Sequence, residues 1–203
     1  MNPIIQKLIE ENIDYIEAEN FDVVYDKAMS VNNKINIGEL TDVFYDAGID
    51  PLASLTEIPP LFLDESKITA LVVPENIKKI RTSGFAFSNV EHVQLHDDCE
   101  LSENSFYSSR IRSIVIPHIM NEVPDECFYG CEELEYIDIS DVDQIGAEAF
   151  YNCKNLKSIF IPDDINYIAD TAFYDCPVTL YFHNNNEYAI EYCQRNNMEY
   201  KFV

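Results

Sequence analysis

The chain has 203 residues and a formal net charge of −24, from 13 Lys and Arg against 37 Asp and Glu. This acidity argues against direct binding to nucleic acid or to an anionic membrane surface, so a charged partner would be basic. No apolar run approaches the roughly 20 residues of a membrane span, and the first residues lack a long hydrophobic stretch, so we expect a cytoplasmic protein.

The N-terminal third shows helical periodicity and no repeat. Apolar residues over 3–29 recur at three- and four-residue spacing, which predicts one long helix or two shorter helices separated near Asn20. A further helix is predicted over 38–47, and the prolines within 49–63 mark an irregular connection. We expect residues 1–66 to dock on the rest of the chain as a helical N-terminal cap, the alternative being a small domain of its own.

The rest of the chain is organised by a repeated six-residue segment. Five copies follow the pattern apolar-x-x-apolar-x-apolar, and a sixth copy is degenerate; their last apolar positions lie 21 to 23 residues apart. The copies are 68–73, 90–95, 111–116, 134–139, 156–161 and 177–182. Such short strands can keep apolar positions away from water only against neighbouring copies, so the pattern predicts a stacked solenoid.

A second ladder of residues has the same period. It consists of Phe85, Phe106, Phe128, Phe150 and Phe173, each with an apolar residue five positions earlier. A small residue stands immediately before each Phe and another three positions after it. Small side chains suit places where successive turns of chain approach closely, so both ladders indicate one continuous core.

These features, with Pro after three of the strands and the string Ala-Phe-Tyr-x-Cys at 149–153 and 172–176, resemble the BspA-type leucine-rich repeat family. The resemblance covers about residues 68–203. It implies a right-handed α/β solenoid in which each turn contributes one short strand of a parallel sheet, a bend, and a short helical turn that carries the Phe. We therefore expect a leucine-rich-repeat solenoid of about six turns over residues 67–183.

Residues 184–203 are expected to form a C-terminal cap, because the last turn of a solenoid otherwise exposes its core. An amphipathic helix is predicted over 187–195 and ends at Asn196 and Asn197, and a short strand is predicted over 198–203. A terminal helix and strand of this kind also occur in the resembling family.

No set of nucleophiles, bases or metal ligands converges at a recognisable spacing, so we predict no catalytic, metal or cofactor site and no enzyme. Cys127 and Cys131 are only four residues apart, which invites a zinc or redox interpretation. Both occupy small-residue positions of the repeat, however, and no second Cys or His pair accompanies them.

The densest group of potential ligands lies at 96–99, together with His92. In the strand pattern His92 points outward, whereas His96 lies just past the strand end, so these side chains are not expected to converge on a metal. His118 and His183 are far apart in the repeat register and are interpreted as loop residues.

The outward positions of the strands are the candidate partner-binding residues, because leucine-rich-repeat proteins usually bind there. We select Val72, His92, Gln94, Val115, Tyr136, Asp138, Phe160 and Tyr181. Strand propensity alone explains Val, Tyr and Phe at such positions equally well. The three aromatic residues would nevertheless form an exposed patch with a polar rim, which is typical of interface hot spots.

The first hypothesis is a non-enzymatic protein-protein interaction module that binds a protein partner, with a basic or apolar surface, through the sheet face. The alternative is an acidic inhibitor from a phage or mobile element, which mimics nucleic-acid charge to block a host nuclease or defence complex. It rests on the net charge and on residues 121–175, where 14 Asp and Glu face two Lys. A homo-oligomer that uses the exposed patch is a third possibility.

Overall fold

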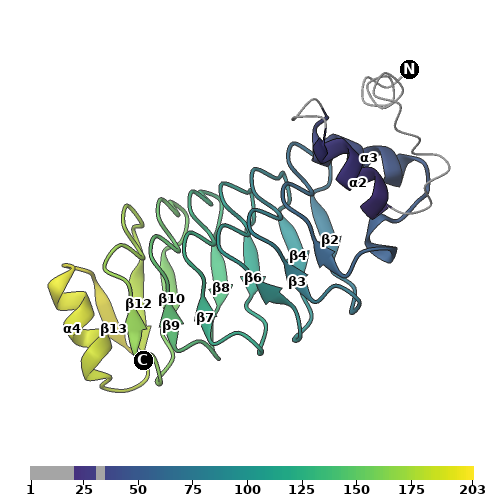
Figure 1. Cartoon of the computed structure of the whole chain (residues 1–203). Helices are drawn as coiled ribbons and strands as arrows, with labels where there is room; N and C mark the ends of the chain where they lie inside the picture. Colours follow the sequence, from purple (N-terminus) through teal and green to yellow (C-terminus); the bar gives the residue numbers. More distant parts are fainter. Residues whose placement is uncertain (1–20, 31–34) are drawn as a thin grey trace.

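The computed structural model describes residues 21–30 and 35–203, which form a solenoid of stacked coils with helices at both ends (Figure 1). At the N-terminal end lie α2 (Phe21–Ser30), α3 (Ile37–Asp46) and the short 3-10 helix η1 (Pro51–Ala53). The predicted helical segment before residue 21 lies outside the described residues.

One row of strands coincides with the six predicted segments. It contains β2 (Ala70–Val72), β4 (His92–Gln94), β6 (Ser113–Val115), β8 (Tyr136–Asp138), β10 (Ser158–Phe160) and β12 (Thr179–Phe182). All pairs are parallel, and equivalent positions of successive coils are partners, as in Ile114 with Ile137. The hydrogen-bonded ladder runs from β2 to β8 and starts again at β10, which pairs with β12. The short-strand parallel sheet is therefore confirmed.

A second row of two-residue strands was not predicted. It contains β1 (Glu57–Ile58), β3 (Lys79–Ile80), β5 (Glu100–Leu101), β7 (Glu122–Val123), β9 (Gln144–Ile145) and β11 (Tyr167–Ile168). In this row, strands β3 to β11 each end on the apolar residue five positions before a ladder Phe. Two residues are too short to show any periodicity of their own, and only the pairing between coils identifies them as strands.

The second row also shows where the stacking begins. Ile58 pairs in register with Ile80, and Leu63, which is fully buried, occupies the position that Phe holds in later coils. Half a coil thus lies within the region where the sequence predicted an irregular connection. The sequence does not reveal this copy, because Leu63 replaces the ladder Phe and the half coil has no strand of the first row.

The turn that carries each Phe is not helical, in contrast to what the family resemblance implied. Residues on either side of the Phe adopt positive φ, for example Asn104 at 59° and Ser108 at 52°. The backbone N–H of Phe106 donates to the carbonyl of Cys127 in the next coil, at 2.9 Å. Equivalent bonds at 2.8 to 2.9 Å link the other coils, so the N–H groups that a helix would use internally join neighbouring coils.

The core is a stack of Phe rings inside the coils. Consecutive centroids from Phe85 to Phe173 are 5.3, 5.4, 5.7 and 5.2 Å apart. The flanking cysteines form no disulfide; Cys127, Cys131 and Cys153 are buried and Cys176 is half-buried. The Cys131 thiol donates to the carbonyl of Phe106 at 2.9 Å. Small thiols therefore fill the close approach between coils, and the Cys131 thiol adds a second hydrogen bond to a carbonyl that also accepts from the N–H of Ser109.

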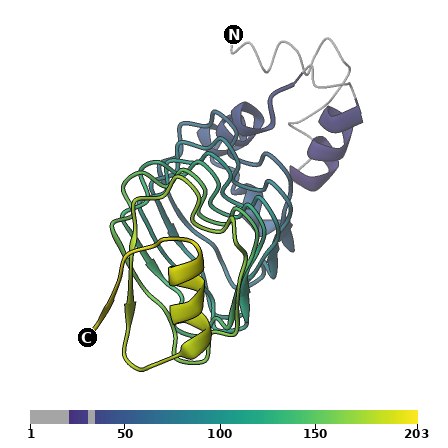
Figure 2. The same cartoon turned by 90° about the vertical axis from the view of Figure 1, so that its left-hand side faces the viewer.

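Both ends of the solenoid are covered. Figure 2 shows α4 (Glu187–Arg195), which has the predicted bounds, lying across the end of the coils. The Tyr188 hydroxyl accepts from the N–H of Ile168 at 2.7 Å, and β13 (Tyr200–Phe202) pairs with β12.

At the other end of the solenoid, α3 packs against the first half coil. Thr41 Oγ1 donates to the carbonyl of Phe62 at 2.7 Å, and Asp42 accepts from Ser66 Oγ at 2.6 Å. A Cβ on Gly38 would lie 2.0 Å from the carbonyl oxygen of Asp64, so only glycine permits this approach.

Candidate protein-binding face

The outward side of the first strand row forms one continuous face. Inward residues such as Ile159 and Leu180 are buried, because side chains of a strand alternate between its two sides. The side chains between them remain open: Val72, Val115, Tyr136 and Phe160 are 64, 56, 55 and 52% exposed. We call this surface the sheet face.

All eight residues that the sequence analysis selected lie on the sheet face. The register places Val72 beside Gln94, Val115 beside Asp138, and Phe160 beside Tyr181, while His92 pairs with Ser113. Asp138 and Tyr181 are half-buried, and the other six are exposed. The structure thus brings these residues together; their role in binding stays a prediction.

Shallow hollows follow the N-terminal half of the sheet face. One of about 310 Å³ lies over β2 and β4, between Val72 and His92. The next, of about 250 Å³, reaches from Gln94 to Tyr136 across Val115. Their walls are largely aliphatic, as expected for a contact surface with few polar anchors.

The C-terminal half of the sheet face carries an aromatic group that the sequence analysis identified only in part. The Phe160 ring lies 5.5 Å from that of Tyr181 and 5.7 Å from that of His183, which is nearly parallel to it at 19°. Tyr136 and Phe160 line a common hollow of about 270 Å³. We call these four residues the Phe160 cluster.

His183 was interpreted as a loop residue in the sequence analysis. It directly follows the last inward residue of β12, the position that Pro162 holds one coil earlier. This place in the repeat was the signal that could have indicated its contact with Phe160.

A second aromatic array, also missed, runs along the turns that carry the Phe ladder. Tyr107, Tyr129, Tyr151 and Tyr174 each follow a ladder Phe, and their consecutive centroids are 4.6, 4.5 and 5.8 Å apart. The rings are within 9° of parallel, so inner members cover each other's faces. This tyrosine ladder therefore presents ring edges and hydroxyls, whereas the Phe160 cluster is more open.

The potential metal ligands within residues 21–30 and 35–203 are dispersed. Within these ranges no three His, Cys, Asp or Glu side chains lie together as metal ligands. Burial raises the pKa of Cys131 and of Cys176 to about 12, which keeps both thiols protonated and poorly nucleophilic. His96 Nε2 lies 2.7 Å from the carbonyl oxygen of Ile77, so this ring holds two coils together.

Stacked parallel coils with a regular core ladder define a leucine-rich-repeat solenoid. The profile of the BspA-type leucine-rich repeat region matches six copies over residues 56–179, more than half of the chain. The chain belongs to this family. No curated protein matches it significantly. In the described part of the chain, no helix has the length and apolar character needed to cross a membrane.

Two solved structures resemble the fold. A leucine-rich cell surface protein from Faecalibacterium prausnitzii shares 23% identity with a TM-score of 0.58, over 62% of this chain and 35% of that one. A leucine-rich repeat protein from Bacteroides ovatus shares 19% identity with a TM-score of 0.56, over 74% of this chain and 46% of that one. The chain thus spans less than half the length of either, and these similarities concern the fold alone.

Proposed function

We propose that the protein is a non-enzymatic interaction module that binds a protein partner through the sheet face. The observation that carries this proposal is the exposure of Val72, Val115, Tyr136 and Phe160, each more than half open, on one surface. Single exposed apolar residues are ordinary, but several on one rigid surface are typical of interaction sites. Aromatic anchors such as Tyr136 and Phe160 contribute most to binding when a partner covers them.

The partner in this proposal has a basic or apolar surface, and the chain does not bind nucleic acid or membranes directly. The net charge of −24 supports this choice, because like charge repels phosphate groups. A cytoplasmic location is also part of the proposal. All six cysteines are free, as is usual in a reducing compartment. Cell fractionation would distinguish it from the cell surface, where the Faecalibacterium relative is described.

The test compares partner capture by variants of two different surfaces. Tyr136→Ala combined with Phe160→Ala removes both anchors of the sheet face, whereas Tyr167→Ala removes a 49% exposed Tyr from β11 in the second row. Proteins captured from a lysate of the source organism are identified by mass spectrometry. We expect partners of the wild type and Tyr167→Ala to be lost from the double variant. Unchanged capture would exclude the sheet face, and loss of self-association alone would indicate a homo-oligomer.

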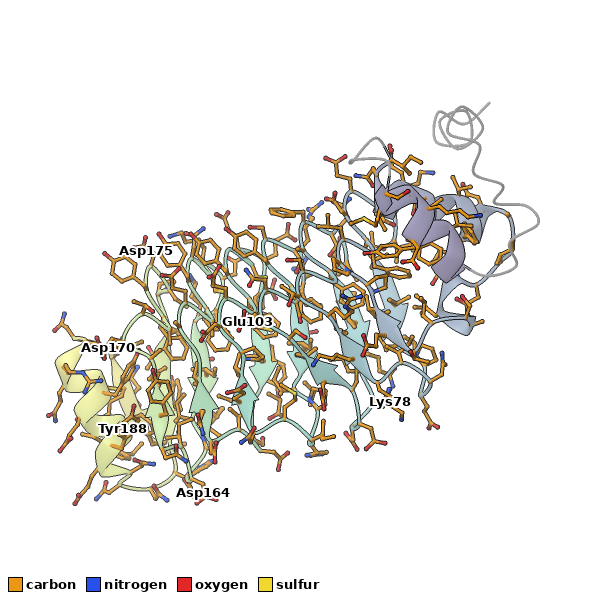
Figure 3. The ribbon with its side chains drawn as sticks, viewed as in Figure 1. Lys78, Glu103, Asp164, Asp170, Asp175 and Tyr188 are labelled. Carbon is orange, nitrogen blue, oxygen red and sulfur yellow. The ribbon has the colours of Figure 1, made fainter. Side chains whose placement is uncertain are left out.

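A second candidate function, the acidic inhibitor that mimics nucleic acid, is favoured by unneutralised carboxylates outside the sheet face. Glu126, Glu148 and Asp175 flank the tyrosine ladder, and no ion pair involves them within the described ranges. Figure 3 shows Asp175 at the edge of the solenoid. Replacing these three by Gln or Asn should weaken binding steeply if charge mimicry operates, and only slightly if the sheet face binds.

A further inference from the structure

We propose that the Phe160 cluster recognises arginine side chains in an extended basic segment of the partner protein. This inference rests on the proposed function and names the chemistry of the partner at one part of the sheet face. A guanidinium group would lie between the Tyr136 and Phe160 rings and pair with Asp138. A second guanidinium would pair with Asp163 or Asp164 on the other side of Phe160.

Two hollows adjoin Phe160. The hollow of about 270 Å³ lies toward the preceding coil, between Phe160 and Tyr136, with Asp138 in its wall. An adjoining hollow of about 290 Å³ is lined by Phe160, Asp163 and Asp164. Each hollow could hold several waters of about 30 Å³, so a planar guanidinium fits without moving the backbone.

The gap in the strand ladder keeps the first hollow open. Strand β10 is hydrogen-bonded to β12 but does not continue the ladder that ends at β8. Tyr181 and His183 pack against Phe160 from the following coil, and no such ring contact joins Phe160 to Tyr136 in the described structure. The Phe160 side chain is 52% exposed, so part of its ring remains available for stacking in the hollow that Tyr136 and His183 also line.

Three carboxylates line these hollows. Asp138 accepts hydrogen bonds from the N–H of Ser140, at 3.0 Å, and from its hydroxyl, and it forms no ion pair with any residue that the structure describes. Asp163 and Asp164 are exposed and likewise lack an ion-pair partner among residues 35–203. Figure 3 shows Asp164 at the edge of the solenoid.

The cationic side chains of neighbouring positions are already engaged. Lys201 pairs with Glu199 at 3.2 Å, and the Lys157 amino group donates to the carbonyl of Lys154. His118 contacts Asp141. The three carboxylates at the hollows thus offer negative charge that the chain itself does not neutralise, and a basic partner would complement it.

Arginine fits these hollows better than lysine does. A guanidinium is planar, stacks on aromatic rings, and binds a carboxylate through two N–H groups at once. The ammonium group of lysine is more strongly hydrated and cannot make this combination. An aromatic pair with a carboxylate between its members therefore favours arginine over lysine of equal charge.

The experiment uses fluorescein-labelled hexa-arginine and hexa-lysine as probes, with the full chain, and measures dissociation constants by fluorescence anisotropy. Two isosteric variants are compared: Asp138→Asn, which keeps the oxygen that accepts from Ser140, and Glu103→Gln, which removes one charge from an exposed turn outside the sheet face. Thermal melting monitored by circular dichroism verifies that both variants are folded. The equal charge of the two peptides separates guanidinium recognition from general attraction to an acidic protein.

We expect the wild type and Glu103→Gln to bind hexa-arginine several-fold more tightly than hexa-lysine. Asp138→Asn should lose about tenfold in affinity for hexa-arginine and most of its preference over hexa-lysine, because a charge-assisted pair is lost. Equal affinity of the wild type for both peptides would overturn the inference, and so would equal losses in the two variants. The proposed function would survive either result as long as the variant with both Tyr136→Ala and Phe160→Ala fails to capture the partner.

Discussion

The Phe ladder allows a quantitative comparison between an interior coil and the last coil. Phe128 stacks on Phe106 and Phe150, at 5.4 and 5.7 Å, whereas the only ladder ring against Phe173 is Phe150, at 5.2 Å. Replacing either buried Phe by Ala costs about 3 to 5 kcal/mol, from lost burial and the cavity that remains. Each aromatic contact contributes about 1 kcal/mol beyond burial, so Phe128→Ala should destabilise the protein by about 1 kcal/mol more than Phe173→Ala.

The measurement is urea unfolding followed by far-ultraviolet circular dichroism, because the chain has no Trp for fluorescence. Both variants remove the same side chain, so the difference between their free energies of unfolding reports the position in the stack. The slope against urea should be the same for both, which verifies that similar surface is exposed on unfolding. A loss from Phe173→Ala equal to or greater than that from Phe128→Ala would refute the nearest-neighbour account of this solenoid.

Two further predictions concern titration and thiol access. Hydrogen bonding to Asp141, together with its charge and that of Asp97, raises the pKa of exposed His118 above its ordinary value of 6.5. Its stabilising effect is therefore fully present below about pH 6.5 and is lost as the pH rises through the folded-state pKa. The urea midpoint should fall more between about pH 6 and about pH 8 in the wild type than in His118→Gln, and identical profiles would contradict this assignment. Burial raises the pKa of Cys99 to about 11 and that of Cys131 to about 12, so a thiol reagent at neutral pH should react fully with the six cysteines only after denaturation. Rapid reaction of all six in the native protein would show that the coils open.

Several features of this protein could be predicted from local sequence because each coil repeats the same pattern of core residues. The alternation over 134–139 and the Phe at 128 independently specify which side chains face the core. The terminal helix over Glu187–Arg195 was predicted with its observed bounds, since Asn186 accepts from Ala189 N–H as an N-cap and Asn196 ends the helix. These elements depend on neighbours within one coil or one helical turn.

The candidate site shows where prediction from local patterns ended. Phe160 and Tyr181 were assigned to the sheet face from alternation alone, and the structure places their rings 5.5 Å apart. His183 was interpreted as a loop residue, and it does lie in the bend that follows β12. Its contact with Phe160 joins residues in successive coils, and the lateral position of a strand end is visible only after the coils are stacked.

By itself, the sequence determined the period and the two core ladders, because both depend on an apolar spacing that every coil repeats. It also determined the C-terminal helix, because the N-cap at Asn186 and the helical periodicity are local. Only the tertiary structure decided the second strand row, the half coil that begins at Glu57, and the hollows beside Phe160. The physical reason is that these features arise from pairing between coils about 22 residues apart. Pairing between coils defines the two-residue strands, and its absence leaves the gap between β8 and β10. Neither feature has a periodic signal of its own in the sequence.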